Sequence, residues 1–197
     1  MKNVFYFSNL IMLMFISCVR SLYPITENEK DVVFKKELVG HWKNAKDNTE
    51  YIVSSTINGS KNYKVMVLDH SSDKKGVDTS NFLVMLVSIK GHYFLDCTPD
   101  TSESVYSKIS EQERSLLLPA HLIIKVYTIQ KDYFTMSAID NDALSLLLKN
   151  RKIIIKHEEI NKNEILLIEK PPMLQQKLIE LEKFSSVYKK DSLIRIK

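Results

Sequence analysis

The chain has 197 residues, of which 44% are hydrophobic and 26% are charged, a balance typical of one globular domain. Its formal net charge is +4, and no block interleaves basic with aromatic residues, so nucleic acid is not an expected partner. The chain has two cysteines, Cys18 and Cys97, and Cys18 follows an apolar leader. These cysteines exclude a small secreted scaffold held together by disulfides.

The first 18 residues carry the clearest motif. Lys2 is followed by an uncharged run up to Ser17, and Cys18 ends it. The run is shorter than the ~20 apolar residues that a membrane-spanning helix needs, and it resembles a bacterial lipoprotein signal peptide. The resemblance implies removal of residues 1–17, palmitate or a similar acyl chain on Cys18, and a lipid anchor in the bacterial cell envelope, on an unspecified membrane face. An ordinary cleaved signal and an uncleaved anchor are the alternatives.

Residues 18–33 are then expected to be a lipidated tether, and residues 34–197 a single β-rich domain. Leu22 and Tyr23 are unusual in a pure linker and could dock on the domain surface.

Strand patterns dominate from Leu38 onward. The expected strands are Thr49–Thr56, Lys61–Asp69, Phe82–Ile89, His92–Cys97, Leu122–Ile129 and Tyr133–Ile139. Asn58-Gly59 is a strong hairpin signal between the first two. Residues 70–80 read as a polar loop, and residues 99–113 as an irregular segment with one helical turn near Ser110–Arg114.

After residue 139 the spacing of the apolar residues changes from that of a strand to that of a helix. Asp140 can cap a short helix over Asp142–Lys149. Further along, Ile153–His157 and Glu164–Glu169 form a candidate hairpin, and Pro171 starts a longer helix. Its apolar stripe is Leu174, Leu178, Leu181 and Phe184, and Ser192–Ile196 reads as a terminal strand.

These elements predict a mostly β fold. An antiparallel meander would form either a lipocalin-like barrel or a strongly curved open sheet, with a C-terminal amphipathic helix and one short internal helix. Leu38-Val39-Gly40-His41-Trp42 resembles the start of lipocalin-like domains. That resemblance implies that Trp42 is a buried structural residue on the first strand, closing one end of the barrel.

The wider pattern is similar to an uncharacterised family of bacterial envelope lipoproteins. The matching segments are Leu22-Tyr23-Pro24, Leu38-Val39-Gly40-His41-Trp42, Tyr93-Phe94-Leu95-Asp96, Leu118-Pro119-Ala120-His121 and His157-Glu158. This resemblance implies a location and a fold, and it supplies no catalytic residues.

Candidate chemistry is limited to a few side chains. Asp96, His121 and His157, together with Glu158, could form a His/carboxylate ligand or metal site. The favoured alternative is structural, with His121 hydrogen-bonded to a carboxylate such as Asp96. Cys97 reads as a buried, inert thiol rather than a nucleophile.

No phosphate-binding loop, nucleophile elbow or cofactor motif occurs, so no cofactor is expected and enzymatic activity is not favoured. The favoured function is therefore a membrane-anchored interaction module that docks on another envelope protein. The alternatives are lipocalin-like binding of a small apolar ligand and, less favoured, a metal-dependent hydrolase. An open apolar interior would favour the ligand, and a packed interior the interaction module.

Overall fold

The computed structural model describes residues 19–47, 49–56, 60–70, 77–101, 120–161 and 164–196. The expected signal peptide with Cys18, the Asn58-Gly59 turn and the helical turn near Ser110–Arg114 lie outside these residues. The described strands are β1 (Arg20–Ser21), β2 (Val32–Val33), β3 (Gly40–Asn44), β4 (Glu50–Ser55), β5 (Asn62–Asp69), β6 (Asp78–Ile89), β7 (His92–Pro99), β8 (His121–Ile129), β9 (Tyr133–Ala138), β10 (His157–Asn161), β11 (Glu164–Leu167) and β12 (Asp191–Arg195). The helices are α2 (Asn141–Lys149) and α3 (Pro171–Leu181).

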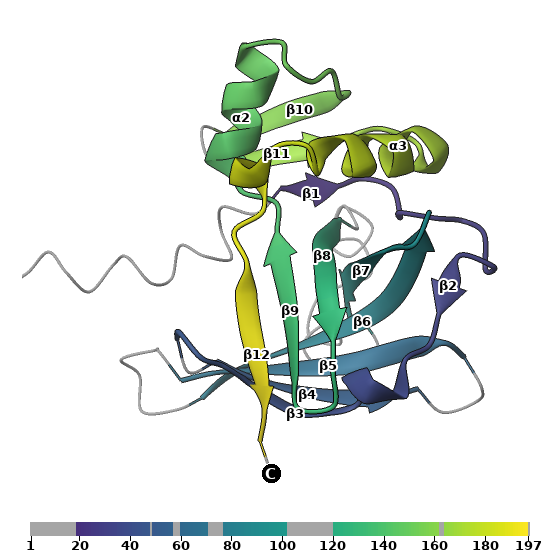
Figure 1. Cartoon of the computed structure of the whole chain (residues 1–197), viewed down its shortest axis with the longest axis vertical. Coiled ribbons are helices and arrows are strands. Elements are labelled where there is room, and N and C mark those ends of the chain that lie inside the picture. Colours follow the sequence, from purple (N-terminus) through teal and green to yellow (C-terminus); the bar gives the residue numbers. More distant parts are fainter. Residues whose placement is uncertain are drawn as a thin grey trace, which may run out of the picture.

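Eight of these strands form a closed antiparallel barrel (Figure 1). Strands β3 to β9 pair consecutively as a meander, β12 pairs with both β3 and β9, and β8 also pairs with β9. The fold is thus mostly β, and the closed barrel rather than the open sheet is the observed architecture. Closure leaves these eight strands without an unpaired edge.

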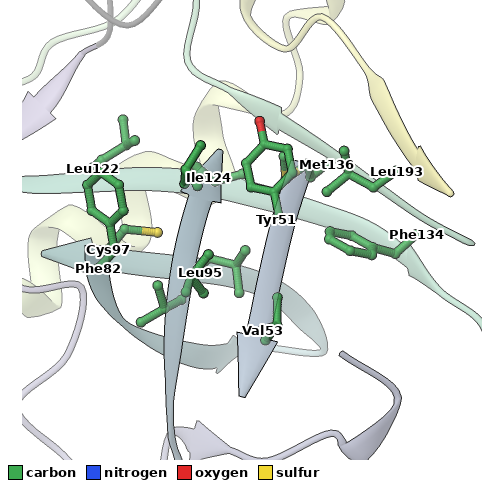
Figure 2. A pocket seen from close by; sticks show the side chains of 13 residues that line it. Tyr51, Val53, Phe82, Leu95, Cys97, Leu122, Ile124, Phe134, Met136 and Leu193 are labelled. Carbon is green, nitrogen blue, oxygen red and sulfur yellow. The ribbon is translucent and has the colours of Figure 1, made fainter. Parts of the chain in front are cut away.

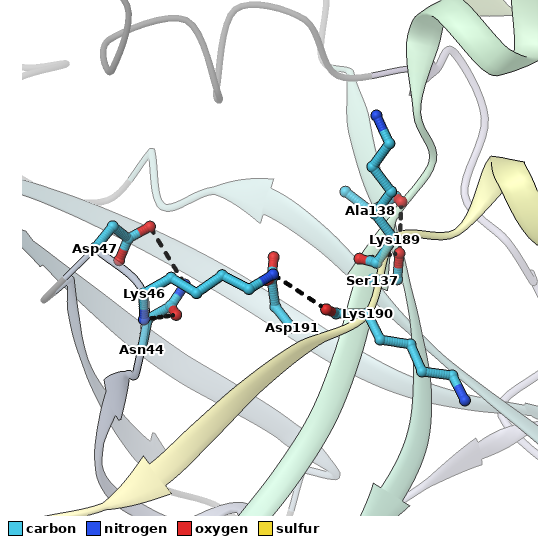
Figure 3. Close-up of polar contacts among 8 residues, drawn as sticks. All are labelled: Asn44, Lys46, Asp47, Ser137, Ala138, Lys189, Lys190 and Asp191. Carbon is cyan, nitrogen blue, oxygen red and sulfur yellow. Dashed lines mark hydrogen bonds and ion pairs between the residues drawn. The ribbon is translucent and has the colours of Figure 1, made fainter.

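Strand β12 closes the barrel, and polar contacts hold the residues at its start (Figure 3). The Ser137 hydroxyl on β9 donates a hydrogen bond of 2.8 Å to the Lys189 carbonyl. On the other side, Lys46 in the turn after β3 donates to the Lys190 carbonyl at 3.3 Å and pairs with Asp191. The chain entering β12 is therefore held from both neighbouring strands.

Some sequence-based boundaries were wrong. Ile153–His157 is not a strand: β10 begins at His157, while Ile153 and Ile155 are buried in the preceding loop. The polar loop is shorter than expected because β6 begins at Asp78 and pairs there with Asp69. Helix α3 ends at Leu181, so Phe184 lies beyond it. Leu174, Leu178 and Leu181 are all buried, and Asp140 caps α2 by accepting a hydrogen bond from the Ala143 N–H.

A second layer, here called the cap, covers part of the outer barrel wall (Figure 1). It consists of α2, α3 and the strands β1, β10 and β11, and β1 joins it to the barrel by pairing with β8. The pairing of β1 with β11 is parallel, unlike the meander. Outward-facing Val87, Phe94 and Ile123 of the barrel pack with Leu174 and Leu178 of α3 in one apolar core.

The described part of residues 18–33 is not a free tether. Val19 and Ile25 belong to the core beneath the cap, at 1% and 0% exposure. Strand β2 pairs with β6, and the Leu22 N–H donates to the Leu167 carbonyl at 2.8 Å. The described residues 19–33 therefore pack against the β-rich domain that was expected to start at residue 34.

Trp42 lies on β3, the first strand of the barrel in chain order. Trp42 is fully buried, and its indole N–H donates 2.8 Å to the carbonyl of Leu38, in the 3-10 turn Lys36–Leu38. Phe134 contacts the indole edge-on at 4.8 Å between ring centroids. Such aromatic pairs add to the stabilisation from burial.

Candidate functional site

The barrel interior contains an apolar cavity (Figure 2). Figure 2 shows Leu95 and Ile124 between Phe82 on one side and Phe134 on the other. Every barrel strand except β3 contributes to the wall. The lining residues are Tyr51, Val53, Val65, Val67, Phe82, Val84, Leu95, Cys97, Leu122, Ile124, Phe134, Met136 and Leu193.

The apolar wall of the cavity results from the alternating directions of side chains along each strand. Side chains of a strand point alternately to its two faces, so Leu95 and Cys97 of β7 face the cavity while Phe94 packs outside, under the cap. In β8, Leu122 and Ile124 face inward and Ile123 faces the cap. Strands β7 and β8 are apolar on both faces because each face is covered.

The wall presents an uncharged, apolar surface throughout. Burial raises the pKa of the Tyr51 hydroxyl, and the nearby carboxylates of Asp47 and Asp191 raise it further. Burial also raises the pKa of the Cys97 thiol, with a smaller effect from Asp96. Both groups therefore stay neutral at ordinary pH. Because thiolate is the nucleophilic form, Cys97 acts as an apolar wall residue and not as a catalytic nucleophile.

The cavity has a volume of about 80 Å³. Sites for drug-sized molecules are several times larger, at roughly 300–1,000 Å³. An eight-stranded barrel is wide enough either to be filled by its own side chains or to hold one small ligand. This interior is only partly filled by its own side chains, and none of the residues that line the cavity is charged.

Asp96 and His121 meet, but outside the barrel. His121 Nδ1 lies 2.6 Å from Asp96 Oδ1, the hydrogen bond expected from the sequence. The Ile25 N–H donates to Asp96 Oδ2 at 2.7 Å. Asp96 is 1% exposed, and Gln175 of α3 donates to the Ile25 carbonyl at 3.1 Å. The pair therefore ties the N-terminal segment to the barrel wall beneath the cap.

His157 is not part of this pair. The pairing register runs from His121 to Ser21, Leu167 and His157 across four neighbouring strands. Three strand spacings correspond to roughly 14 Å. His157 Nδ1 instead lies 2.8 Å from the Ile155 carbonyl, and Glu158 is exposed on β10. Within the described ranges, no three or more His, Cys, Asp or Glu side chains gather in a group that could hold a metal ion.

A second polar cluster lies on the outer wall of the barrel, and no motif in the sequence predicted it. Lys125 of β8 is 7% exposed and pairs with Glu182, just after α3. His92 Nδ1 lies 3.1 Å from the same Glu182 oxygen, and the Lys125 ammonium lies 5.3 Å from the ring centroid of Tyr188. A lysine flanked by apolar residues in a strand gives no hint of a partner about 57 residues away, because that partner is brought in by the packing of α3.

Among the described residues, none of the helices has the length and apolar character needed to cross a membrane. Comparison with models of protein families, with curated proteins and with solved structures found no match to this chain.

Proposed function

We propose that this protein binds a small apolar molecule of a few carbon atoms inside its barrel. The observation that supports the proposal is the partly filled cavity, whose wall is apolar and uncharged throughout. Transfer of apolar surface from water into such a wall stabilises a complex by about 25 cal/mol per Å² buried.

The single tryptophan of the chain offers a direct test. Trp42 contacts Phe134, which lines the cavity. Bromine quenches indole fluorescence only at short range, so a short bromoalkane such as 1-bromobutane in the barrel should quench Trp42. We expect saturable quenching that unlabelled pentane reverses.

Two matched variants locate the binding site. Val65→Phe adds a ring to the cavity wall and should abolish saturable quenching. Ile194→Phe adds a ring at a position that is 54% exposed and should leave it unchanged. Circular dichroism melting checks that both variants fold. Quenching that never saturates, or that survives Val65→Phe, would contradict the proposal and favour an interaction module.

The proposal includes attachment to the bacterial cell envelope through an acyl chain on Cys18. Its support is the order of the N-terminal residues, with Ser17 directly before Cys18 after a short apolar run. Several acyl chains suffice for stable anchoring. In the native host, the wild-type protein should incorporate labelled palmitate and Cys18→Ala should not. Equal labelling of the two proteins would refute attachment at Cys18 and leave the ligand proposal intact.

A further inference from the structure

The outer end of the cap carries a ridge that is both basic and apolar, here called the cap ridge. It is formed by the last turn of α2 and the loop that follows. Its members are Leu146, Lys149, Arg151, Lys152, Ile154 and Lys156, and all six are exposed. Leu146 is 59% exposed and Ile154 is 76% exposed, the highest value among the large hydrophobic residues described.

The backbone holds this ridge in place. The Lys152 N–H donates to the Leu147 carbonyl at 2.9 Å, and the Arg151 N–H to the Leu148 carbonyl at 3.0 Å. With Arg151 at φ +53°, this is a Schellman ending of α2. Ile153 and Ile155 are both 3% exposed, so they anchor the loop in the core and leave Ile154 between them projecting outward. Ile154 therefore projects from a supported loop.

The charge of the cap ridge is uncompensated. In the described part of the chain, none of its four cations makes an ion pair, and no acidic residue lies between Asp142 and Glu158 in the sequence. A cationic surface attracts anions, while exposed Leu146 and Ile154 would lose unfavourable hydration on entering an apolar phase. A partner that binds both the cations and the apolar side chains must be anionic at its surface and apolar immediately beneath it.

We propose that the cap ridge is a contact surface for an anionic phospholipid bilayer. The basic side chains lie at the headgroups and Ile154 and Leu146 reach the boundary with the acyl chains, the arrangement of surface-bound membrane segments. Val19 packs in the same core as Ile153 and Ile155. The described chain therefore starts, at Val19, within the core of the cap. The contact depends neither on the cavity ligand nor on acylation of Cys18.

The test places an environment-sensitive label at residue 154 of the full chain. The Ile154→Cys protein carries a nitrobenzoxadiazole group, with mass spectrometry verifying the label position, and is mixed with vesicles of phosphatidylglycerol and phosphatidylcholine in equal parts. We expect a blue-shifted emission that spin-labelled acyl chains quench. The matched control is Ile194→Cys on the barrel strand β12, also largely exposed, whose label should stay aqueous.

Charge dependence completes the test. Replacing Lys149, Arg151 and Lys152 with Gln, Asn and Gln should weaken insertion of the label by about two orders of magnitude, at roughly fivefold for each cation near the membrane surface. Insertion should also be weak in pure phosphatidylcholine vesicles.

Co-sedimentation reports binding to the vesicles through any contact, whereas the label at residue 154 reports the cap ridge alone. Protein that sediments while its label stays aqueous is therefore held by another contact, such as the N-terminal segment. A label at residue 154 that stays aqueous on vesicle-bound protein would overturn the proposal. Insertion that ignores the three substitutions would overturn it too, as would binding to heparin without insertion into vesicles, which would point to an acidic macromolecule.

Discussion

The guanidinium group of Arg195 lies over the indole of Trp42, 4.1 Å from the ring centroid. Arg195 ends β12 and Trp42 lies on β3, and the two residues are register partners where the last strand closes the barrel. Gly40 has φ +150°, and a Cβ there would overlap Arg195 Nη1, so the glycine makes room for the guanidinium group. Gly40 and Trp42 therefore both lie against the guanidinium group of Arg195.

Arg195 should therefore stabilise barrel closure strongly for a residue near the chain end. Its guanidinium donates to the Val39 carbonyl at 2.9 Å and to the Glu37 carbonyl at 2.6 Å. Arg195→Ala should lower the free energy of unfolding by about 2–3 kcal/mol. Arg195→Lys keeps the charge without the planar fork and should recover less than half of the loss. Urea unfolding measures both, and an Ala variant as stable as wild type would refute this role.

Ile25 should behave as a core residue and not as part of a tether. Because its side chain is fully buried with α3, Ile25→Ala should cost about 2–5 kcal/mol. The control, Glu29→Ala, changes an exposed residue of the same segment and should be nearly neutral. Thermal melting compares the two. Equal melting temperatures would mean that the segment from residue 19 does not dock.

The His121–Asp96 hydrogen bond should be structural and independent of metal. His121→Ala leaves one oxygen of a buried carboxylate without its partner and should lower stability by about 1–3 kcal/mol. His70→Ala, at an exposed position, is the control. Melting should not change when a chelator is added. A chelator-induced drop in wild type that disappears in His121→Ala would instead establish a metal site.

Asp140 should give a pH-dependent contribution to stability. Burial raises the pKa of its carboxyl, but hydrogen bonds from the Lys189 ammonium and the Ala143 N–H outweigh burial, so the net pKa is lowered. A lowered folded-state pKa stabilises the protein fully above the unfolded value of about 3.9, and the contribution is lost as the pH falls through the folded value.

Asp140→Asn keeps the helix cap and removes the charge. The stability difference between wild type and Asp140→Asn should therefore be positive at pH 7 and shrink below about pH 4. Asp140→Ala removes the cap as well and should cost about 1 kcal/mol more. Urea unfolding at pH 7 and pH 3 provides the comparison. A difference that grows on acidification would contradict the sign derived for Asp140.

The sequence predicted local elements well and long-range contacts poorly. Alternation marked β4 and β5, and Asp140 and Pro171 marked the helix starts, because these signals lie within a few residues of each other. It misassigned Ile153–His157 because a loop with three consecutive isoleucines has the same apolar pattern as a short strand. It also missed that Val19 and Ile25 belong to the core, since their partners in α3 lie about 150 residues away.

For the candidate site, too, the sequence predicted local features and did not predict those that depend on long-range packing. Inward-facing positions such as Val65 and Val67 could be assigned by parity, and the Asp96–His121 contact followed from neighbouring strands. Whether the barrel interior is filled could not be predicted. That depends on how the volumes of side chains from seven strands sum across the closed barrel, which is a property of three-dimensional packing and not of any segment.

Native mass spectrometry of the protein purified from its own host tests ligand binding in the barrel most directly. We expect wild-type protein to carry one apolar molecule in addition to any N-terminal lipid. The same molecule should be absent from Val65→Phe, which fills the cavity, and present in Ile194→Phe, which alters the exposed outer wall. Wild-type protein with no such molecule, or a molecule retained equally by Val65→Phe, would contradict ligand binding inside the barrel.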